Sequence, residues 1–142
     1  MNLLLEIITP EKIVYKNEID ELIVPTVNGQ IAILPNHVGL FAKIIPGELI
    51  IRKKNSQEAL AVTGGFLEVA KNHISILADY AIRAEDIEVA KAMEAQKRAE
   101  KLMVEKTSDR DFRMAQADLI RAITELKVAT KYKRKASRPS EV

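Results

Sequence analysis

The chain has 142 residues, of which 47% are hydrophobic and 30% are charged, values that fit one ordinary globular domain. It contains no cysteine, which excludes disulfides, thiolate catalysis and cysteine-ligated zinc. Its net charge of +2 is uneven: residues 127–142 hold six basic side chains against one acidic side chain, so residues 1–126 carry a net charge of −3. No segment has the roughly 18 apolar residues of a membrane-spanning helix, and no basic leader opens the chain, so we expect a soluble protein.

The first 84 residues predict short strands. Residues 3–7 and 74–78 alternate apolar residues with others, which is the pattern of a strand with one buried face. Five further β-branched or apolar runs lie between them, at 19–24, 30–34, 48–52, 60–62 and 66–70.

Turn residues separate these runs. Asn28 and Gly29 predict a tight type I′ hairpin, because both residues tolerate positive φ. Pro25, Pro35 and Pro46 predict strand ends, because proline offers no N–H to a ladder. Residues 54–56 and 71–72 predict two more hairpin loops. Many short strands separated by turns predict an antiparallel β-sandwich or flattened barrel over residues 1–84.

The period changes after residue 84. Proline and glycine are absent until Pro139, and apolar residues recur at steps of three and four, as on a helix with one narrow contact stripe. Acidic residues at 85, 86 and 88 predict the start of a first helix, where the macrodipole favours negative charge. Ser108 followed by Asp111 resembles a capping box and predicts the start of a second helix. The predicted stripe consists of Ala92, Ala95, Ala99, Leu102, Phe112, Ala115, Leu119, Ala122, Leu126 and Ala129.

The fold class predicted from these two periods is α+β, mainly β. We expect the β-sandwich at residues 1–84, an antiparallel two-helix hairpin at 85–132 and a basic, disordered tail at 133–142. Alanine supplies six of the ten stripe residues, and each buried methyl contributes only about 0.8 kcal/mol. Ordering a residue costs about 1.5 kcal/mol. The sequence therefore predicts a marginal hairpin that is able to rearrange beside a rigid sandwich.

No set of residues predicts catalysis. His37 and His73 are separated by several predicted strands and lack the spacing of a metal motif. Gly64 and Gly65 lack the spacing of a phosphate-binding loop and no helix follows them, so a bulge or tight turn is the better interpretation. No motif nominates a serine nucleophile. We therefore expect neither an enzyme nor a metal site.

The basic tail leaves several partners open: RNA, DNA, an anionic membrane or an acidic protein surface. It has one aromatic residue, Tyr132, which supports base stacking poorly. A solvated tail without a partner is an equal alternative.

Several segments taken together resemble the epsilon subunits of bacterial F-type ATP synthases. Residues 26–40, TVNGQIAILPNHVGL, resemble that family's small hairpin followed by GILPxH, with Ala32 in place of glycine. Pro46-Gly47, the run GGFLEV at 64–69 and the run NHISILA at 72–78 follow in the family's order and spacing. The resemblance covers residues 2–130.

The resemblance implies a non-catalytic rotor subunit of a proton-translocating ATP synthase, peripheral on the cytoplasmic face of the cell membrane. The sandwich is expected to bind the gamma subunit and the c ring, with contacts at Asn28, Gly29, Gln30, His37 and Val38. The hairpin is expected to restrain ATP hydrolysis by extending along gamma into the alpha/beta head. There, basic residues of the second helix (Arg113, Arg121 and Lys127) match those that meet an acidic stretch of the beta subunit.

Some epsilon subunits also bind ATP through an I(L)DxxRA motif, which here reads IEVAKA at residues 87–92. Aspartate has become Glu88 and arginine has become Lys91, whose ammonium cannot reproduce the planar fork of arginine. The corresponding candidate residues for ATP as a regulatory ligand are Ile87, Glu88, Lys91, Arg98 and Arg121. No other cofactor is expected.

Three function classes remain to be compared. The first is a structural and regulatory rotor subunit. The second is a nucleic-acid-binding module that uses the basic tail, whose affinity would fall steeply with salt. The third is a freestanding ATP-sensing domain.

Overall fold

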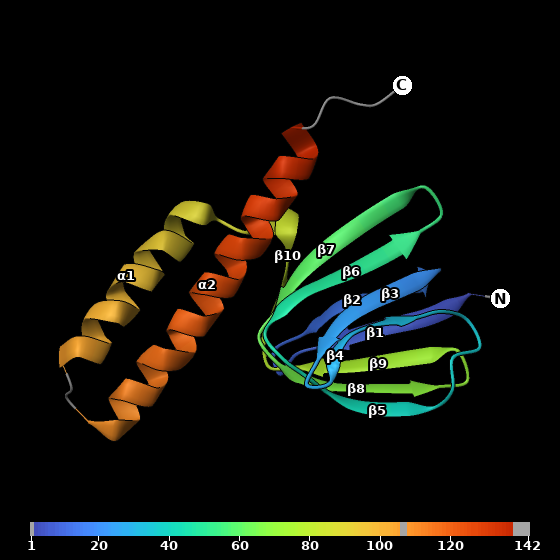
Figure 1. Cartoon of the computed structure of the whole chain (residues 1–142), viewed down its shortest axis with the longest axis horizontal. Helices are drawn as coiled ribbons and strands as arrows, with labels where there is room; N and C mark the ends of the chain where they lie inside the picture. The colour runs from blue at the N-terminus through green and yellow to red at the C-terminus, as the bar shows by residue number, and fades with distance from the viewer. Residues whose placement is uncertain (1, 106–107, 138–142) are drawn as a thin grey trace. The chain divides into compact units, whose positions relative to one another are not determined.

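The computed structural model describes residues 2–105 and 108–137, without the side chains of 135–137. The chain divides into two compact units, Met1–Arg83 and Ala84–Val142, called unit 1 and unit 2 below. Unit 1 contains the strands and unit 2 contains the helices (Figure 1). This α+β architecture confirms the predicted fold class.

Unit 1 consists of ten strands joined by short turns. Their bounds are β1 (Leu3–Ile8), β2 (Ile13–Ile19), β3 (Glu21–Thr26), β4 (Gly29–Ile33), β5 (Leu40–Ile44), β6 (Gly47–Lys53), β7 (Ser56–Val62), β8 (Gly65–Ala70), β9 (His73–Ala78) and β10 (Ala81–Arg83).

The strands form two layers joined at one edge. One layer has the order β10-β7-β6-β3, with β4 added to β3, and the other has the order β5-β8-β9-β1-β2. The layers are connected where Thr26 of β3 pairs with Ile44 of β5. In Figure 1, β6 and β7 lie above β5, β8 and β9. All pairs are antiparallel except β1 with β9, which is parallel and departs from the fully antiparallel sandwich that the sequence predicts.

Alternation along the strands creates the core between the two layers. Every second residue of β1 and of β8 is buried, and the intervening residues face outward. The largest fully buried side chains are aliphatic: Leu3, Leu5, Ile7, Ile19, Leu22, Ile33, Ile44, Leu49, Ile51, Leu60, Leu67 and Ile74. An aliphatic core is what a chain without tryptophan and with 4% aromatic residues must build.

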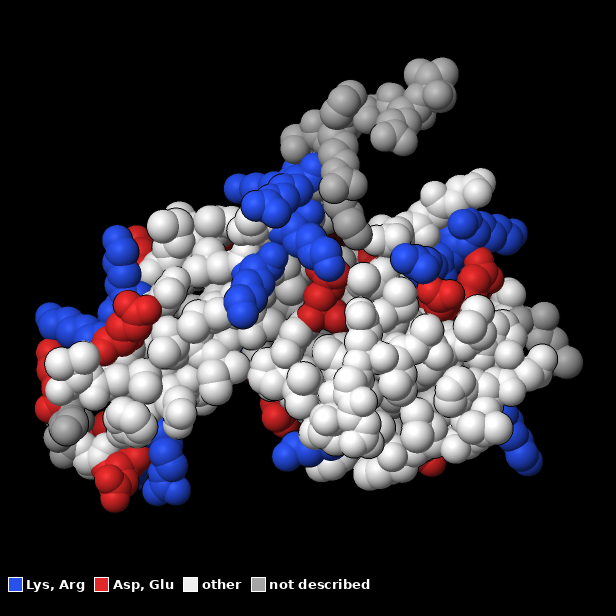
Figure 2. All heavy atoms as spheres, viewed as in Figure 1, with Lys and Arg blue, Asp and Glu red and all other residues white. Residues whose placement is uncertain are grey.

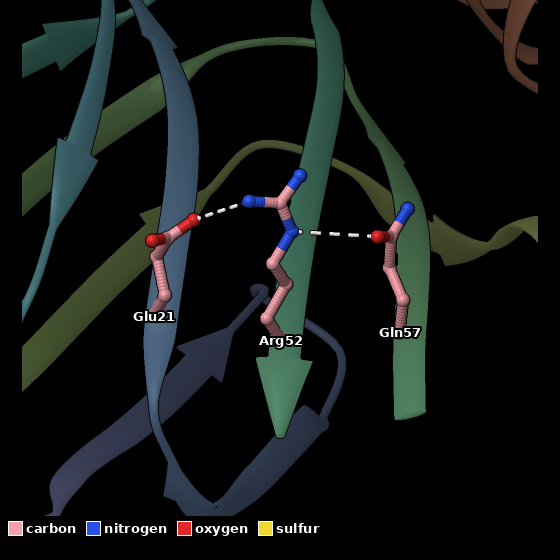
Figure 3. Close-up of polar contacts among 3 residues, drawn as sticks. All are labelled: Glu21, Arg52 and Gln57. Atoms are coloured by element: carbon pink, nitrogen blue, oxygen red, sulfur yellow. Dashed lines mark hydrogen bonds and ion pairs between the residues drawn. The ribbon is translucent and has the colours of Figure 1, made fainter. Parts of the chain in front are cut away.

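The outer face of the first layer carries a polar ladder across three strands. Arg52 on β6 donates to the Glu21 carboxylate on β3 at 2.7 Å and to the Gln57 side-chain oxygen on β7 at 3.4 Å (Figure 3). The register places these three residues side by side. A charged residue bonded to both neighbours holds the strands in register on a solvent-facing surface.

Three strands were not predicted as separate elements, namely β2, β5 and β10. The prediction that Pro25 ends a strand is wrong, because β3 continues through Thr26. The Pro25 carbonyl accepts the Ile45 N–H at 3.1 Å, so the backbone polar groups of Pro25 face away from β4. A proline at such a position removes no hydrogen bond from the β3–β4 ladder.

The predicted hairpin at Asn28 is present but shifted by one residue. Its two-residue turn is Val27-Asn28, and positive φ falls on Gly29 (109°) rather than on Asn28. The prediction of a type I′ turn is therefore wrong. The Thr26 hydroxyl stabilises the observed turn, because it donates to the Gly29 carbonyl at 2.6 Å and accepts the Asn28 N–H at 3.2 Å.

The glycine pair is a strand connection, as predicted. Gly64 and Gly65 both have positive φ, 138° and 143°; Gly64 precedes β8 and Gly65 is its first residue. A Cβ at Gly65 would lie 2.0 Å from the Leu77 carbonyl oxygen, so this position requires glycine for both conformation and space. The backbones of β8 and β9 are thereby able to pair closely at this end of the sheet.

Unit 2 is a helical hairpin. A 3₁₀ turn (η1, Ala84–Asp86) precedes α1 (Val89–Glu105), and α2 runs from Asp109 to Ser137. The α-helix thus begins later than predicted, at Val89, because the Ile87 N–H donates to the Ala84 carbonyl and closes a separate short turn. The predicted cap of the second helix is confirmed, since the Asp111 N–H donates to the Ser108 hydroxyl at 3.0 Å.

The central part of the predicted alanine stripe is buried. Ala92, Ala99, Ala115 and Ala122 are almost completely inaccessible, whereas Leu102 and Phe112, near the connection, are exposed. Residues 133–137, assigned from sequence to the tail, continue α2. Lysine, arginine and alanine have high helix propensity, and no proline intervenes before Pro139. The remainder of the predicted tail lies outside the described residues.

Candidate interaction surfaces

A row of apolar side chains crosses the outer face of the second layer. The register aligns Phe66 of β8, Leu77 of β9, Ile8 of β1 and Ile13 of β2. Phe41 of β5 is 69% exposed and stacks on Phe66, with the ring centroids 5.6 Å apart. We call these five residues the apolar row.

The apolar row is unusual because it lies on the solvent face. Phe66, Leu77 and Ile13 are all exposed, although their strands already bury the opposite face in the core. Contiguous exposed apolar residues on a soluble domain mark surfaces for protein partners. Sequence reasoning missed this surface. Its signal is the presence of Phe66 and Leu77 at positions out of phase with the buried residues of β8 and β9.

A charged group lies beside the apolar row. The Glu6 carboxylate on β1 lies 3.3 Å from His73 Nε2 on β9 and 3.9 Å from the Lys16 ammonium on β2. The register places Ser75 opposite Glu6. Polar groups at the border of an apolar patch are typical of the rim of a protein interface.

The two loops predicted as partner contacts are exposed but do not meet. Gly29 and Gln30 begin β4, Asn28 precedes them in the turn, and the loop that carries His37 and Val38 follows the end of β4. Three further residues of β4, roughly 10 Å of strand, lie between Gln30 and this loop. Val38 is 76% exposed, and His37 Nδ1 lies 2.7 Å from its carbonyl oxygen.

The structure brings the two histidines to the same end of unit 1. The Asn36 N–H donates to the Asn72 side-chain oxygen at 2.6 Å, and this contact ties the loop before His37 to the turn before His73. Both asparagines have positive φ, 68° and 62°. No group of three or more side chains that could hold a metal ion occurs among the described residues.

The basic residues predicted on the second helix all face solvent. Lys and Arg side chains gather along the C-terminal part of α2 (Figure 2). Arg113, Arg121 and Lys127 are exposed, and their spacing places them within roughly 120° of the helix circumference. The Arg121 guanidinium contacts Glu125 at 3.3 Å, and Arg113 donates to the Asp109 carbonyl at 3.4 Å.

Two of the basic residues predicted for ATP already contact carboxylates within unit 2. The Lys91 ammonium lies 2.9 Å from Glu88, and this hydrogen bond raises the pKa of Lys91 above its usual value. Ile87 is buried, and Arg121 pairs with Glu125. A phosphate group would have to replace a carboxylate at two of these positions. Arg98 is exposed on α1.

None of the helices in the described part of the chain is long and apolar enough to cross a membrane.

Comparisons with known proteins agree over nearly the whole chain. Residues 2–84 match the family model of the β-sandwich domain of the ATP synthase delta/epsilon chain. Residues 85–130 match the model of the long α-helix domain of the same chain. Both boundaries lie within one residue of the division between units 1 and 2.

Relatives of similar length share about two fifths of their residues with this chain. The ATP synthase epsilon chain of Dehalococcoides mccartyi strain CBDB1 is 41% identical over 128 residues, covering 89% of this chain and 91% of that one. The epsilon chain of Herpetosiphon aurantiacus is 40% identical over 129 residues, covering 91% and 95%.

Solved structures share the fold at low sequence identity. A chain of the Euglena gracilis mitochondrial ATP synthase, solved with F1 and the c ring, superposes with a TM-score of 0.75 at 17% identity, covering 91% of this chain and 81% of that one. A chain of the Tetrahymena thermophila central stalk and c ring gives a TM-score of 0.57 at 16% identity, covering 91% and 97%.

Proposed function

Since the chain belongs to the ATP synthase delta/epsilon family, as an epsilon chain of the bacterial type, we propose that it links the gamma subunit to the c ring in the rotor and restrains ATP hydrolysis through unit 2. The chain is a non-catalytic subunit of that synthase. Its place is peripheral, on the cytoplasmic face of the cell membrane, in a proton-translocating complex. Family membership favours this function over the nucleic-acid-binding alternative.

The apolar row is the observation that carries the rotor assignment. Five apolar side chains from five strands form one surface, and the Phe41 and Phe66 rings already stack on each other in the chain without a partner. A preorganised aromatic pair is a good anchor for a permanent interface, because little side-chain entropy is lost on binding. We assign this surface to gamma. The Asn28–Gln30 turn and the His37–Val38 loop are assigned to the c ring and to the adjoining part of gamma.

The restraint of hydrolysis is assigned to unit 2 because its packing is weak. The buried residues of α1 are two alanines, Ala92 and Ala99, Ala115 and Ala122 are buried on α2, and the apolar residues near the connection are exposed. An element held by so little buried area has two arrangements within a few kcal/mol of each other, as a regulatory switch requires. The exposed cations of α2 supply charge for an acidic surface of the beta subunit.

Reconstitution tests the rotor assignment. A synthase complex depleted of its epsilon subunit is titrated with the wild-type chain, with a Phe66→Asp variant and with an Ile45→Asp variant. Ile45 is also an exposed apolar residue of unit 1 but lies outside the apolar row. A carboxylate buried without a partner weakens binding by tenfold or more, so we expect Phe66→Asp to bind at least tenfold less tightly and Ile45→Asp to bind like the wild type. Equal binding of all three chains would contradict the assignment.

A further inference from the structure

Strand β4 has an open edge. Three strands of unit 1 pair on one side only within the described residues, namely β2, β4 and β10. β4 pairs with β3 along its whole length, from Gly29 opposite Thr26 to Ile33 opposite Leu22. Its other side faces no strand.

The position of Pro25 shows which backbone groups lie on this edge. The Pro25 carbonyl accepts a hydrogen bond from Ile45, on the side of β3 away from β4. Pro25 opposite Gln30 is therefore a non-hydrogen-bonded pair. The N–H and C=O of Gln30 accordingly point outward, and alternation adds those of Ala32. These four backbone groups form the open edge.

The open edge lacks the features that protect the other two. β2 carries Lys16 and Glu18, whose charges oppose pairing with another chain, and β10 is only three residues long. β4 reads Gly-Gln-Ile-Ala-Ile, without a charge or a proline. Apolar residues flank it at both ends, with Val27 53% and Leu34 51% exposed. A five-residue edge without a charge or a proline, between exposed apolar residues, is suited to accept a strand.

We propose that the open edge of β4 binds an extended, uncharged segment of a neighbouring stalk chain, which adds to the sheet as an eleventh strand. Backbone hydrogen bonds to Gln30 and Ala32 hold the segment, and Val27 and Leu34 contact its apolar side chains. The inference rests on the proposed function, and it adds a second contact of a different kind to the apolar row. It makes the backbone of β4, rather than the side chains of the Asn28–Gln30 turn, the main determinant of binding.

Hydrogen–deuterium exchange resolved to single amides tests this directly. We expect the Gln30 and Ala32 amides to exchange at least tenfold more slowly in the assembled complex than in the isolated chain. The Ile31 amide is an internal control. The alternation that turns the Gln30 and Ala32 amides outward directs the Ile31 N–H toward β3. Its exchange should slow far less than theirs.

Two substitutions at one position separate backbone from side chain. Ala32→Pro removes a backbone N–H that the β3–β4 ladder does not use. Ala32→Thr keeps this N–H and introduces a residue that is favourable in strands. We expect Ala32→Pro to bind an epsilon-depleted complex at least tenfold less tightly and Ala32→Thr to bind like the wild type. Thermal unfolding of both variants reports whether the fold is retained, and the exchange experiment on the wild type does not depend on either variant.

The outcomes distinguish the inference from the function on which it rests. Assembly of the wild-type chain without slower exchange at Gln30 and Ala32 overturns the inference and leaves the rotor function standing. If the Gln30 and Ala32 amides of the isolated chain exchange more slowly as its concentration rises, the occupant of the open edge is a second copy of the chain. That result also overturns the inference. Failure of the wild-type chain to join the complex overturns both.

Discussion

Tyr15 introduces an ionisable hydroxyl into an otherwise aliphatic core. Its side chain is buried, and burial raises its pKa to about 12, with a further contribution from the charge of Glu58 on β7. The Arg83 guanidinium lies 5.5 Å from the centre of the Tyr15 ring and 3.5 Å from the Glu58 carboxylate, and it lowers this pKa in part. The three residues connect β2, β7 and β10 just before the chain enters unit 2.

The raised pKa predicts that alkaline pH destabilises unit 1. Because the pKa in the folded state lies above the ordinary value of 10, the stabilisation is complete below pH 10 and is lost as the pH rises to about 12. We expect the free energy of unfolding to fall over this window, and to fall less steeply for Tyr15→Phe, which has no hydroxyl to ionise. Urea unfolding between pH 8 and pH 12 measures both. The exposed Tyr132 provides the matched control, and Tyr132→Phe should follow the wild type. Identical slopes for Tyr15→Phe and the wild type would refute the argument.

At the scale of elements, the sequence predicted long periodic segments better than short ones. Alternation located β1 and β9, and the steps of three and four located both helices. β5 and β2 were missed because their exposed positions include Phe41 and Ile13, which interrupt a simple alternation of apolar and polar residues. Those same residues belong to the apolar row. Two of the strands that the sequence pattern failed to predict, β2 and β5, therefore contribute residues to the candidate interface.

The alanine contacts of the hairpin predict unequal local stability. Amides of α1 and of α2 up to residue 125 should exchange faster with deuterium than those of β8 and β9 in the same chain, because alanine methyls contribute little buried area. Equal protection of helices and strands would show that the hairpin is not marginal.

A pair of variants isolates the buried methyl. Ala115 is buried and Ala117 is exposed on the same helix. Glycine costs about 1 kcal/mol in propensity at either site, and only Ala115→Gly also loses a buried methyl worth about 0.8 kcal/mol. Exchange across the hairpin should therefore be faster in Ala115→Gly than in Ala117→Gly.

At the scale of the whole molecule, charge separates the two units by role. Unit 1 carries the apolar row and the open edge of β4, and salt affects contacts at these two surfaces only a little. In unit 2, α2 presents exposed cations. Contacts between exposed charges weaken as ionic strength rises. Attachment and regulation are therefore expected to respond differently to salt.

Neutralising the cations of α2 should release ATP hydrolysis without detaching the chain. In a reconstituted complex at low salt, we expect the triple variant Arg113→Ala, Arg121→Ala, Lys127→Ala to hydrolyse ATP several-fold faster than the wild type. High salt should reduce the difference. The matched control removes three other exposed cations of unit 2, at Lys97, Lys101 and Arg110, and should leave hydrolysis unchanged. Equal rates for the triple variant and the wild type would contradict a regulatory role for these residues.

The sequence by itself determined the α+β class, the change of period near residue 84, the alanine stripe and the family resemblance, because propensity, periodicity and ordered motifs are local properties of a chain. The tertiary structure decided which outward residues share one surface. Phe41, Phe66, Leu77, Ile8 and Ile13 become neighbours only through the pairing of five strands, one pair of which is parallel. Likewise, β4 has an open edge and Pro25 tolerates a strand interior only because of the strand order around β3. Strand pairing joins residues distant in sequence, and local patterns do not encode which strands become partners or in which register.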